Sequence, residues 1–179
     1  MLYEIYDAQF SNNQWSGGSG AIWDLSQNQQ RPLDWTSADA SGLAILPGLI
    51  RYQETYIDQE INHAIRFTLS SIQAAYIQPA THSDGRGGHD ANKPPMGLRL
   101  RLKAGFDISG FDQPIQVILT AMKKYGIILT DTGGDMFISG EHHDAWDDDV
   151  LRQLSDVTLN DFEAVETGPI TPYPHDWTP

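Results

Sequence analysis

The chain has 179 residues, of which 40% are hydrophobic and 20% are charged, and it contains no cysteine. This composition predicts one folded domain of ordinary size and excludes a disulfide framework, a thiolate zinc site and a thiol nucleophile. A formal net charge of −13 argues against binding to nucleic acid, because that binding depends on lysine and arginine side chains that neutralise phosphates. No apolar run reaches the roughly 18 residues of a membrane span, so we expect no membrane partner.

Strands separated by turn residues are expected in the first hundred residues. Strand-like sequence opens the chain at residues 1–7, and the turn at residues 16–19 leads into a short apolar strand at residues 20–24. Near residue 100, three leucines alternate with basic residues, which predicts a strand with one buried face: Leu98, Leu100 and Leu102.

Residues 63–69 also alternate, and this pattern predicts a half-buried strand. The residues on its apolar face are His63, Ile65, Phe67 and Leu69. We expect residues 74–78 to pair with this strand as a hairpin. The polar segment between Pro79 and Pro95 is too long for a tight connection and is a candidate functional loop.

Helical signals occur twice in the second half of the chain. Asp112 is placed to cap a helix over residues 113–125, with Gly126 immediately after its end. A second short helix is expected to begin near Trp146, where three aspartates favour its N-terminus.

These elements together predict a mainly β fold. Residues 127–130 and 136–138 are expected to form a further hairpin. About eight short strands and one or two short helices, without βαβ alternation, favour a β-sandwich or jelly roll. We assign residues 1–168 to this single domain and the proline-rich residues 169–179 to an extended C-terminal tail on the surface.

The negative charge is concentrated near the C-terminus. Residues 131–179 contain 12 acidic side chains and a single basic one, Arg152. Such a cluster is usually a solvated face, and its oxygens are also donors of the kind that calcium prefers. The run from Gly140 to Asp149 adds two histidines to the carboxylates, but its spacing matches no zinc motif. We therefore assign no metal ligands and no cofactor, with calcium as the one ion left open.

Three residues are the predicted catalytic groups: Glu54, His63 and Asp131. His63 lies on the apolar face of its predicted strand, and Glu54 and Glu60 shortly precede it. Partial burial beside a carboxylate shifts a pKa toward neutrality, which is what a general acid or base needs. The alternatives are a hydrogen-bonded core histidine at position 63 and a turn-forming residue at Asp131.

Four further residues are predicted to bind substrate: Trp23, Arg66, His82 and Tyr125. Five tryptophans and seven tyrosines in an acidic protein with many loops favour a sugar ligand, whose rings pack against aromatic faces. The alternative is that most tryptophans are core or rim residues. We expect a neutral polysaccharide as partner, because the net charge repels an acidic one unless four arginines gather in one groove: Arg51, Arg66, Arg99 and Arg101.

Several motifs between about Leu2 and Val165 resemble those of a family of largely uncharacterised, mostly exported bacterial proteins. They read GLIRYQE, INHAIRFT, PATH, PPMGLRLRLK and KKYG, and begin at Gly48, Ile61, Pro79, Pro94 and Lys123. Members of that family carry a further segment before the position of Leu2. The resemblance implies a secreted, extracellular protein and a role for the region that holds Glu54, His63 and Asp131.

These observations predict a carbohydrate-active protein, in the first place a glycoside hydrolase that cleaves a neutral polysaccharide. Two carboxylates among Glu54, Glu60 and Asp131 would serve as acid and base, with His63 orienting them. The first alternative is a non-catalytic carbohydrate-binding module with structural calcium. The second is a polysaccharide lyase with His63 or Tyr125 as its base.

Overall fold

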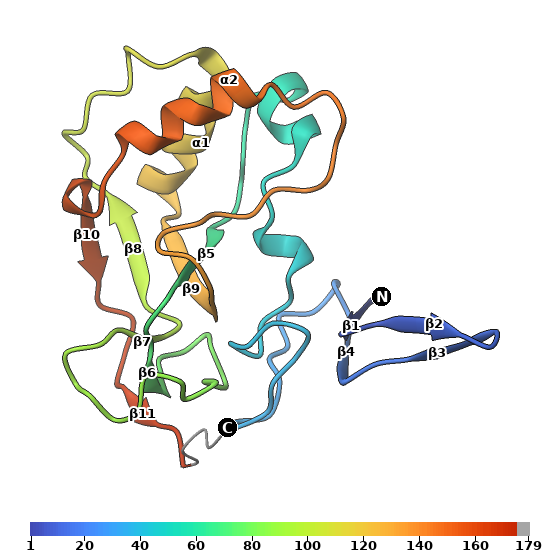
Figure 1. The fold of residues 1–179 in the computed structure, drawn as a ribbon. Coiled ribbons are helices and arrows are strands. Elements are labelled where there is room, and N and C mark those ends of the chain that lie inside the picture. Colours follow the sequence, from blue (N-terminus) through green and yellow to red (C-terminus); the bar gives the residue numbers. More distant parts are fainter. Residues whose placement is uncertain (175–179) are drawn as a thin grey trace.

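A four-stranded sheet forms the centre of the molecule, for which the computed structural model describes residues 1–174. The strand order is β10-β8-β9-β5 (Figure 1). The strands span Ile65–Leu69 (β5), Arg99–Leu102 (β8), Ile127–Thr132 (β9) and Phe162–Val165 (β10). β8 runs antiparallel to both of its neighbours, whereas β5 and β9 are parallel. The sheet is therefore mixed.

Alternation along the strands gives this sheet two different faces. Leu100 of β8 pairs with Ile127 of β9; both are buried and belong to the same core cluster as the apolar side of helix α1 (Gln113–Lys124). Arg99 pairs with Ile128, and both point away from that core because successive strand residues face opposite sides. The expected alternation around residue 100 is thus confirmed. Helix α1 covers the first face of the sheet and not the second.

Helix α1 confirms the helix predicted over residues 113–125. Its apolar stripe is buried against the sheet through Ile115, Ile118, Leu119 and Met122. Asp112 occupies the N-cap position, but its carboxylate accepts a hydrogen bond from Gln153 Nε2 at 2.8 Å instead of capping the helix. None of the helices in residues 1–174 combines the length and apolar character needed to cross a bilayer.

Three smaller sheets and several short helices complete the described chain. A three-stranded sheet has the order β11-β6-β7, and two-stranded ladders join β1 to β4 and β2 to β3. Their bounds are Leu2–Tyr6 (β1), Gln9–Ser11 (β2), Gln14–Ser16 (β3), Ser19–Trp23 (β4), Gln73–Tyr76 (β6), Pro95–Met96 (β7) and Thr171–Pro172 (β11). The helices besides α1 are 3-10 turns at Leu46–Gly48, Arg152–Asp156 and Leu159–Asp161, a π-helix at Gln53–Ile57, and α2 at Asp148–Leu151.

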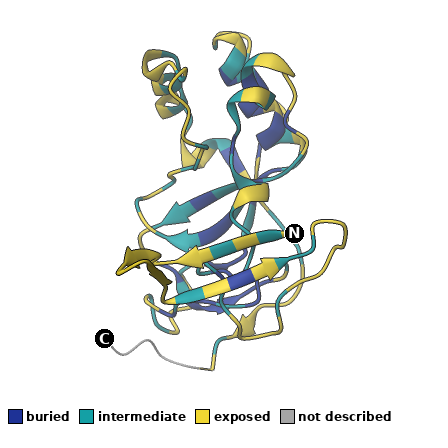
Figure 2. Cartoon of the chain, turned by 90° about the vertical axis from the view of Figure 1, so that its right-hand side faces the viewer, coloured by how far each residue is buried: buried dark blue, intermediate teal, exposed yellow. Residues whose placement is uncertain are grey.

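The N-terminal strands form a long hairpin, residues 2–23, on one side of the body (Figures 1 and 2). Its tip carries Phe10 and Trp15, whose ring centroids are 5.0 Å apart and whose side chains are exposed. The Glu4 carboxylate holds the hairpin to the body by accepting hydrogen bonds from the backbone N–H groups of Ile45 and Leu46 at 2.9 and 3.0 Å. These contacts fix β4 beside the central sheet.

The prediction of a mainly β chain with few short helices is confirmed. The strands expected at residues 1–7 and 20–24 correspond to β1 and β4, and the helix expected near Trp146 is α2, which the Asp147 carboxylate caps. The four small sheets do not confirm a sandwich or jelly roll. Within the predicted tail, β11 pairs with β6, and residues 175–179 lie outside the described residues.

Both predicted hairpins in the body are wrong. β5 pairs in parallel with β9, while β6 belongs to another sheet. Residues 136–138 do not return along β9; instead Ile138 bridges Phe67 of β5, and Thr68 N donates to Phe137 O at 2.9 Å. The alternation in the sequence indicates which face of a strand is buried but not which strand lies beside it. β5 also begins at Ile65, so His63 precedes the strand.

Gly126 makes the turn from α1 into β9, and alanine should not fit there. Its φ is +78°, and a Cβ atom would lie 2.4 Å from the Leu100 carbonyl oxygen. We expect Gly126→Ala to lower the free energy of unfolding by about 2 kcal/mol or more, because both the backbone conformation and the space oppose a side chain. Urea unfolding measures this. Gly105→Ala is the control, since nothing lies within 4 Å of its Cβ position.

Candidate functional site

Two of the predicted catalytic residues contact each other. Glu54 lies in the π-helix, and one of its carboxylate oxygens is 3.3 Å from His63 Nε2, while Arg51 binds the other oxygen. His63 Nδ1 is 2.9 Å from the Ala64 carbonyl oxygen. Because a carbonyl only accepts, Nδ1 donates to it, and a hydrogen bond from Nε2 to Glu54 then requires the second ring proton.

Arg51 and His63 stabilise the ionised form of Glu54. Burial raises the pKa of its carboxyl group, but hydrogen bonds from Arg51 and His63 outweigh burial, and the pKa lies below its usual value. Glu54 is therefore an ionised group that orients His63, which differs from the expected acid with a raised pKa.

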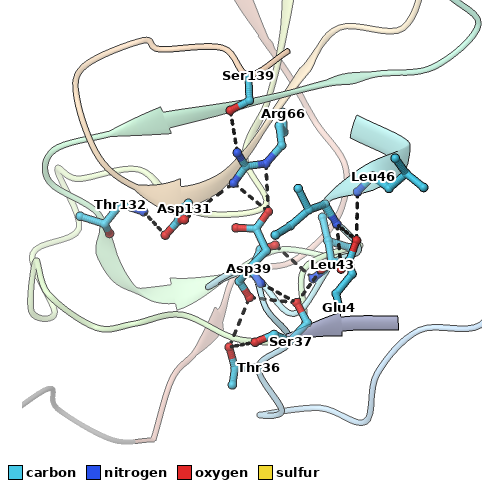
Figure 3. Close-up of polar contacts among 12 residues, drawn as sticks. Glu4, Thr36, Ser37, Asp39, Leu43, Leu46, Arg66, Asp131, Thr132 and Ser139 are labelled. Carbon is cyan, nitrogen blue, oxygen red and sulfur yellow. Dashed lines mark hydrogen bonds and ion pairs between the residues drawn. The ribbon is translucent and has the colours of Figure 1, made fainter. Parts of the chain in front are cut away.

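The third predicted catalytic residue, Asp131, belongs to a different polar cluster (Figure 3). Arg66 of β5 is 3.0 Å through Nη2 from Asp39 Oδ2 and 3.7 Å from Asp131 Oδ2. Arg66 Nε donates to the same Asp39 oxygen at 3.1 Å, and Nη1 donates to Ser139 Oγ at 2.6 Å. One guanidinium group therefore joins two carboxyl groups from distant parts of the sequence.

Asp39 is the more deeply buried of the two carboxyl groups. Its side chain has no exposed surface, and its Oδ1 has no hydrogen-bond partner among the described residues. Burial raises the pKa of Asp39 to about 7, against the opposing charge of Arg66 and with a further increase from Asp131. Near neutral pH, Asp39 therefore exists in both protonation states.

Asp131 is the accessible member of the cluster, with 39% of its side chain exposed. Burial raises its pKa; the charge of Arg66 and a hydrogen bond from Thr132 N oppose this shift, and the charge of Asp84 adds to it. Asp131 lines a cavity of about 340 Å³ together with Asp39, Asp84, His82, Tyr6 and the hydroxyl-bearing residues Ser19, Thr36 and Ser37. We call this the acidic cavity.

A larger cavity of about 470 Å³ adjoins the face of the central sheet that points away from α1. Residues of three strands line it on that side: Arg66, Arg99, Ile128 and Thr130. Trp23 at the end of β4 and the following residues up to Gln30 form another wall, and His63 also lines the space. We call this the sheet cavity. Because Arg66 lines it and binds two residues of the acidic cavity, the two cavities are neighbours.

The predicted site residues therefore divide between two places. Trp23, His63 and Arg66 line the sheet cavity, and Glu54 contacts His63. His82 and Asp131 line the acidic cavity, where His82 Nδ1 is 2.7 Å from the Ala40 carbonyl oxygen and Nε2 is 2.8 Å from the Tyr173 hydroxyl.

Besides Glu54, which contacts His63, two predicted residues line neither cavity. Tyr125 follows α1, and its hydroxyl donates to Asn62 Oδ1 at 2.9 Å. Glu60 is exposed and lies 3.9 Å from Lys124 Nζ. Neither residue appears among those that line the acidic or the sheet cavity.

Asp39 and Asp84 are the functional candidates that sequence reasoning missed. Asp39 lies in an irregular segment without periodicity, so nothing in its neighbourhood indicates burial. Arg66 was the one signal in the sequence for a buried carboxylate such as Asp39, because an arginine in the middle of a half-buried strand needs a carboxylate partner. Asp84 lies in the long polar loop that was predicted to be functional.

The C-terminal carboxylates do not form a metal site within residues 1–174, where no group of three or more His, Asp or Glu side chains could hold an ion. In the acidic run, His142 and Asp144 are almost fully exposed and 4.0 Å apart, and Asp147 caps α2. Structural calcium thus stays a prediction.

The comparisons with known proteins returned no similar protein: no family model, no curated protein and no solved structure matches the chain. The resemblance to exported bacterial proteins also stays a prediction. The two cavities themselves are therefore the observations from which a function can be argued.

Asp39 should make the stability of the protein depend on pH. Its pKa is about 7 in the folded protein against 3.8 for an ordinary aspartate, so the folded state binds the proton more tightly. The stabilisation is complete below pH 3.8 and is lost as the pH rises to about 7. As the pH rises from about 4 to about 8, the free energy of unfolding of the wild type should fall by about 2–4 kcal/mol more than that of Asp39→Asn.

Urea unfolding at several pH values measures this difference. Asp135→Asn is the control, because hydrogen bonds from Ser70 lower the pKa of that exposed carboxylate and it does not titrate in this range. If the free energies of unfolding of the wild type and Asp39→Asn change in parallel with pH, the raised pKa of Asp39 is contradicted.

Proposed function

We propose that the chain is a carbohydrate-active enzyme that hydrolyses glycosidic bonds in the acidic cavity. The observation that carries the proposal is that Asp131 and Asp84 line this one cavity, and that the charge of Asp84 contributes to the raised pKa of Asp131. Glycoside hydrolysis needs two carboxyl groups, one of which is protonated while the other is ionised. A partly buried carboxyl group with a raised pKa beside a second carboxyl group supplies that combination.

In this proposal Asp131 is the general acid and Asp84 is the base or nucleophile. Asp131 is partly exposed and has a raised pKa, so it can keep a proton for the leaving group. The Asp84 carboxylate forms an ion pair with Arg86, whose Nε is 3.4 Å away. Glu54, which the sequence placed in this role, has no free oxygen for it, because Arg51 and His63 bind both oxygens.

Arg66 and Asp39 support Asp131 without reaching the substrate in this scheme. When Asp39 is protonated, the positive charge of Arg66 acts mainly on Asp131 and favours its ionised form. When Asp39 is ionised, the two carboxylates share one guanidinium group. Asp39 is thus a positioning residue that adjusts the acid.

The remaining lining of the acidic cavity suits a sugar. Ser19 and Thr36 donate to the carbonyl oxygens of Ser37 and Asp39, which leaves their hydroxyl oxygens as acceptors, and Tyr6 of the hairpin offers an exposed ring. Such a combination provides hydrogen bonds for sugar hydroxyl groups and an aromatic face for the ring. A polysaccharide partner outside the cell, as the sequence predicts, completes the proposal.

The direct test is release of reducing ends from a panel of neutral and acidic polysaccharides by the full chain. We expect Asp131→Asn and Asp84→Asn each to lower the rate about 100-fold or more, which is the usual loss when a general acid or base is removed. Asp144→Asn, which alters a fully exposed carboxylate, should keep the wild-type rate. Circular dichroism confirms that each variant is folded.

Full activity in folded Asp131→Asn would refute the assignment of the acid. Binding to a polysaccharide without any cleavage would instead identify a carbohydrate-binding module, and the exposed rings of Phe10 and Trp15 would then be the first residues to test.

A second candidate reaction is β-elimination in the sheet cavity. The observation that favours it is that His63, whose Nε2 can act as a base when it carries no proton for Glu54, lines the same space as Arg66 and Arg99. A lyase needs a base beside cationic groups that stabilise the carboxylate of a uronate. This reaction would give unsaturated products that absorb in the ultraviolet; His63→Asn should abolish them, whereas Asp131→Asn should not.

A further inference from the structure

The outer face of the ladder that joins β1 to β4 is apolar and exposed. In this pairing Tyr3 lies opposite Ile22 and Ile5 lies opposite Gly20, so these four residues share one face. Tyr3, Ile5 and Ile22 are each more than half exposed, whereas Ala21 is buried on the opposite face, toward the body. In Figure 2 the two strands cross the front of the molecule, with exposed and less exposed residues alternating along them. The ladder therefore carries apolar side chains on both faces, although the body covers only one.

The hairpin concentrates the exposed apolar surface of the protein. Among residues 1–174, fifteen large apolar side chains are exposed, and eight of them lie within residues 1–25. Toward the tip, the aromatic pair of Phe10 and Trp15 extends this surface, and every residue of β2 and β3 is exposed. Single exposed apolar side chains are common on soluble proteins, but a group of this size marks an interaction surface.

The area of this surface is what a pair of identical chains needs. We call the side chains of Tyr3, Ile5, Phe10, Trp15 and Ile22 the hairpin face. Because each is more than half exposed, together they offer on the order of 600 Å² per chain. Two copies in contact would bury about 1,200 Å², which is the lower bound of a standard protein–protein interface.

The charges of the hairpin favour a second copy of the same chain as the molecule that covers this face. None of the five side chains is charged, and residues 1–23 contain only two charged side chains, Glu4 and Asp7. Glu4 lies on the opposite face, where it accepts hydrogen bonds from the body, and Asp7 lies in the turn between β1 and β2. Interfaces between identical chains are richer in apolar surface than contacts between different proteins, and their cores are poor in charge. Two chains that each carry a net charge of −13 approach best where neither presents a charge.

We propose that the chain forms a symmetric dimer in which the hairpin faces of two copies pack against each other. Gly20 has no side chain, so it leaves a hollow on this face beside the protruding side chains of Tyr3 and Ile22. A two-fold axis places the protrusions of each copy over the hollow of the other. An isolated two-stranded hairpin is only marginally stable, and the second copy supplies packing for it that the body does not.

The dimer acts on both cavities, because the hairpin lines each of them. Tyr6, Gly18 and Ser19 line the acidic cavity, and Trp23 lines the sheet cavity. A second copy that holds the hairpin therefore also holds one wall of each cavity. The dimer does not depend on the proposed hydrolysis, since its contact involves the outer face of the hairpin and not the cavities.

Sedimentation equilibrium of the full chain between about 1 and about 500 µM tests the dimer. We expect the mass to rise with concentration from 19.9 kDa, the mass of one chain, to twice that value and no further. Added salt should tighten the association, because it screens the repulsion between two acidic chains and does not weaken an apolar contact. An association through ion pairs would instead weaken as salt is added.

Two variants of the hairpin face test where the contact lies. Ile5→Thr combined with Ile22→Thr should weaken the dimer at least about tenfold, because threonine keeps a β-branched side chain but removes apolar surface. Trp15→Ser should weaken it as well, and the body should stay folded because every residue of β3 is exposed. Ile170→Thr is the matched control, since Ile170 is 54% exposed, like Ile5, but lies outside the hairpin. Circular dichroism shows whether each variant is folded.

Three results would overturn the dimer. A mass that stays at that of one chain up to the highest concentration would mean that a different apolar partner covers the hairpin face. Association that is unchanged in both hairpin variants would place the contact elsewhere on the molecule. Association that continues beyond two chains would mean that the contact is not symmetric.

Discussion

The contact of Arg66 with Asp39 and Asp131 is the interaction on which both cavities depend. It places a buried carboxyl group, a partly exposed one and a single guanidinium group beside the edge strand β5. A buried carboxylate without a cation is strongly unfavourable, so Asp39 and Arg66 require each other. Burial raises the pKa of Asp39 to about 7 against the opposing charge of Arg66, and the charge of Asp131 raises it further.

The parallel pairing of β5 with β9 makes this contact possible. Thr68 lies opposite Asp131 in the register, which shifts by one residue just before this pair. That bulge is where the apolar run of β9 gives way to the polar residues Asp131 and Thr132. Arg66 on one strand and Asp131 on the other thereby reach the same point, with Asp39 delivered by a loop on the other side.

The end of the hairpin of residues 2–23 lines the cavity on the second face of the central sheet. Helix α1 covers the first face with apolar side chains, whereas the second face carries Arg66 and Arg99. An isolated two-stranded hairpin is only marginally stable in water, so its attachment through Glu4 matters for keeping Trp23 in place. The cavity thus depends on a backbone anchor that lies outside it.

The sequence by itself determined the local features: the alternation of β8, the apolar stripe of α1, the strands at both ends of the hairpin and the pairing of a carboxylate with His63. These follow from periodicity and side-chain chemistry over short spans. Only the tertiary structure decided that β5 lies beside β9, that Asp39 is buried against Arg66, and that Trp23 and Arg99 line the same cavity. Strand partners and buried ion pairs join residues far apart in the chain, and no local pattern encodes which of the possible partners is chosen.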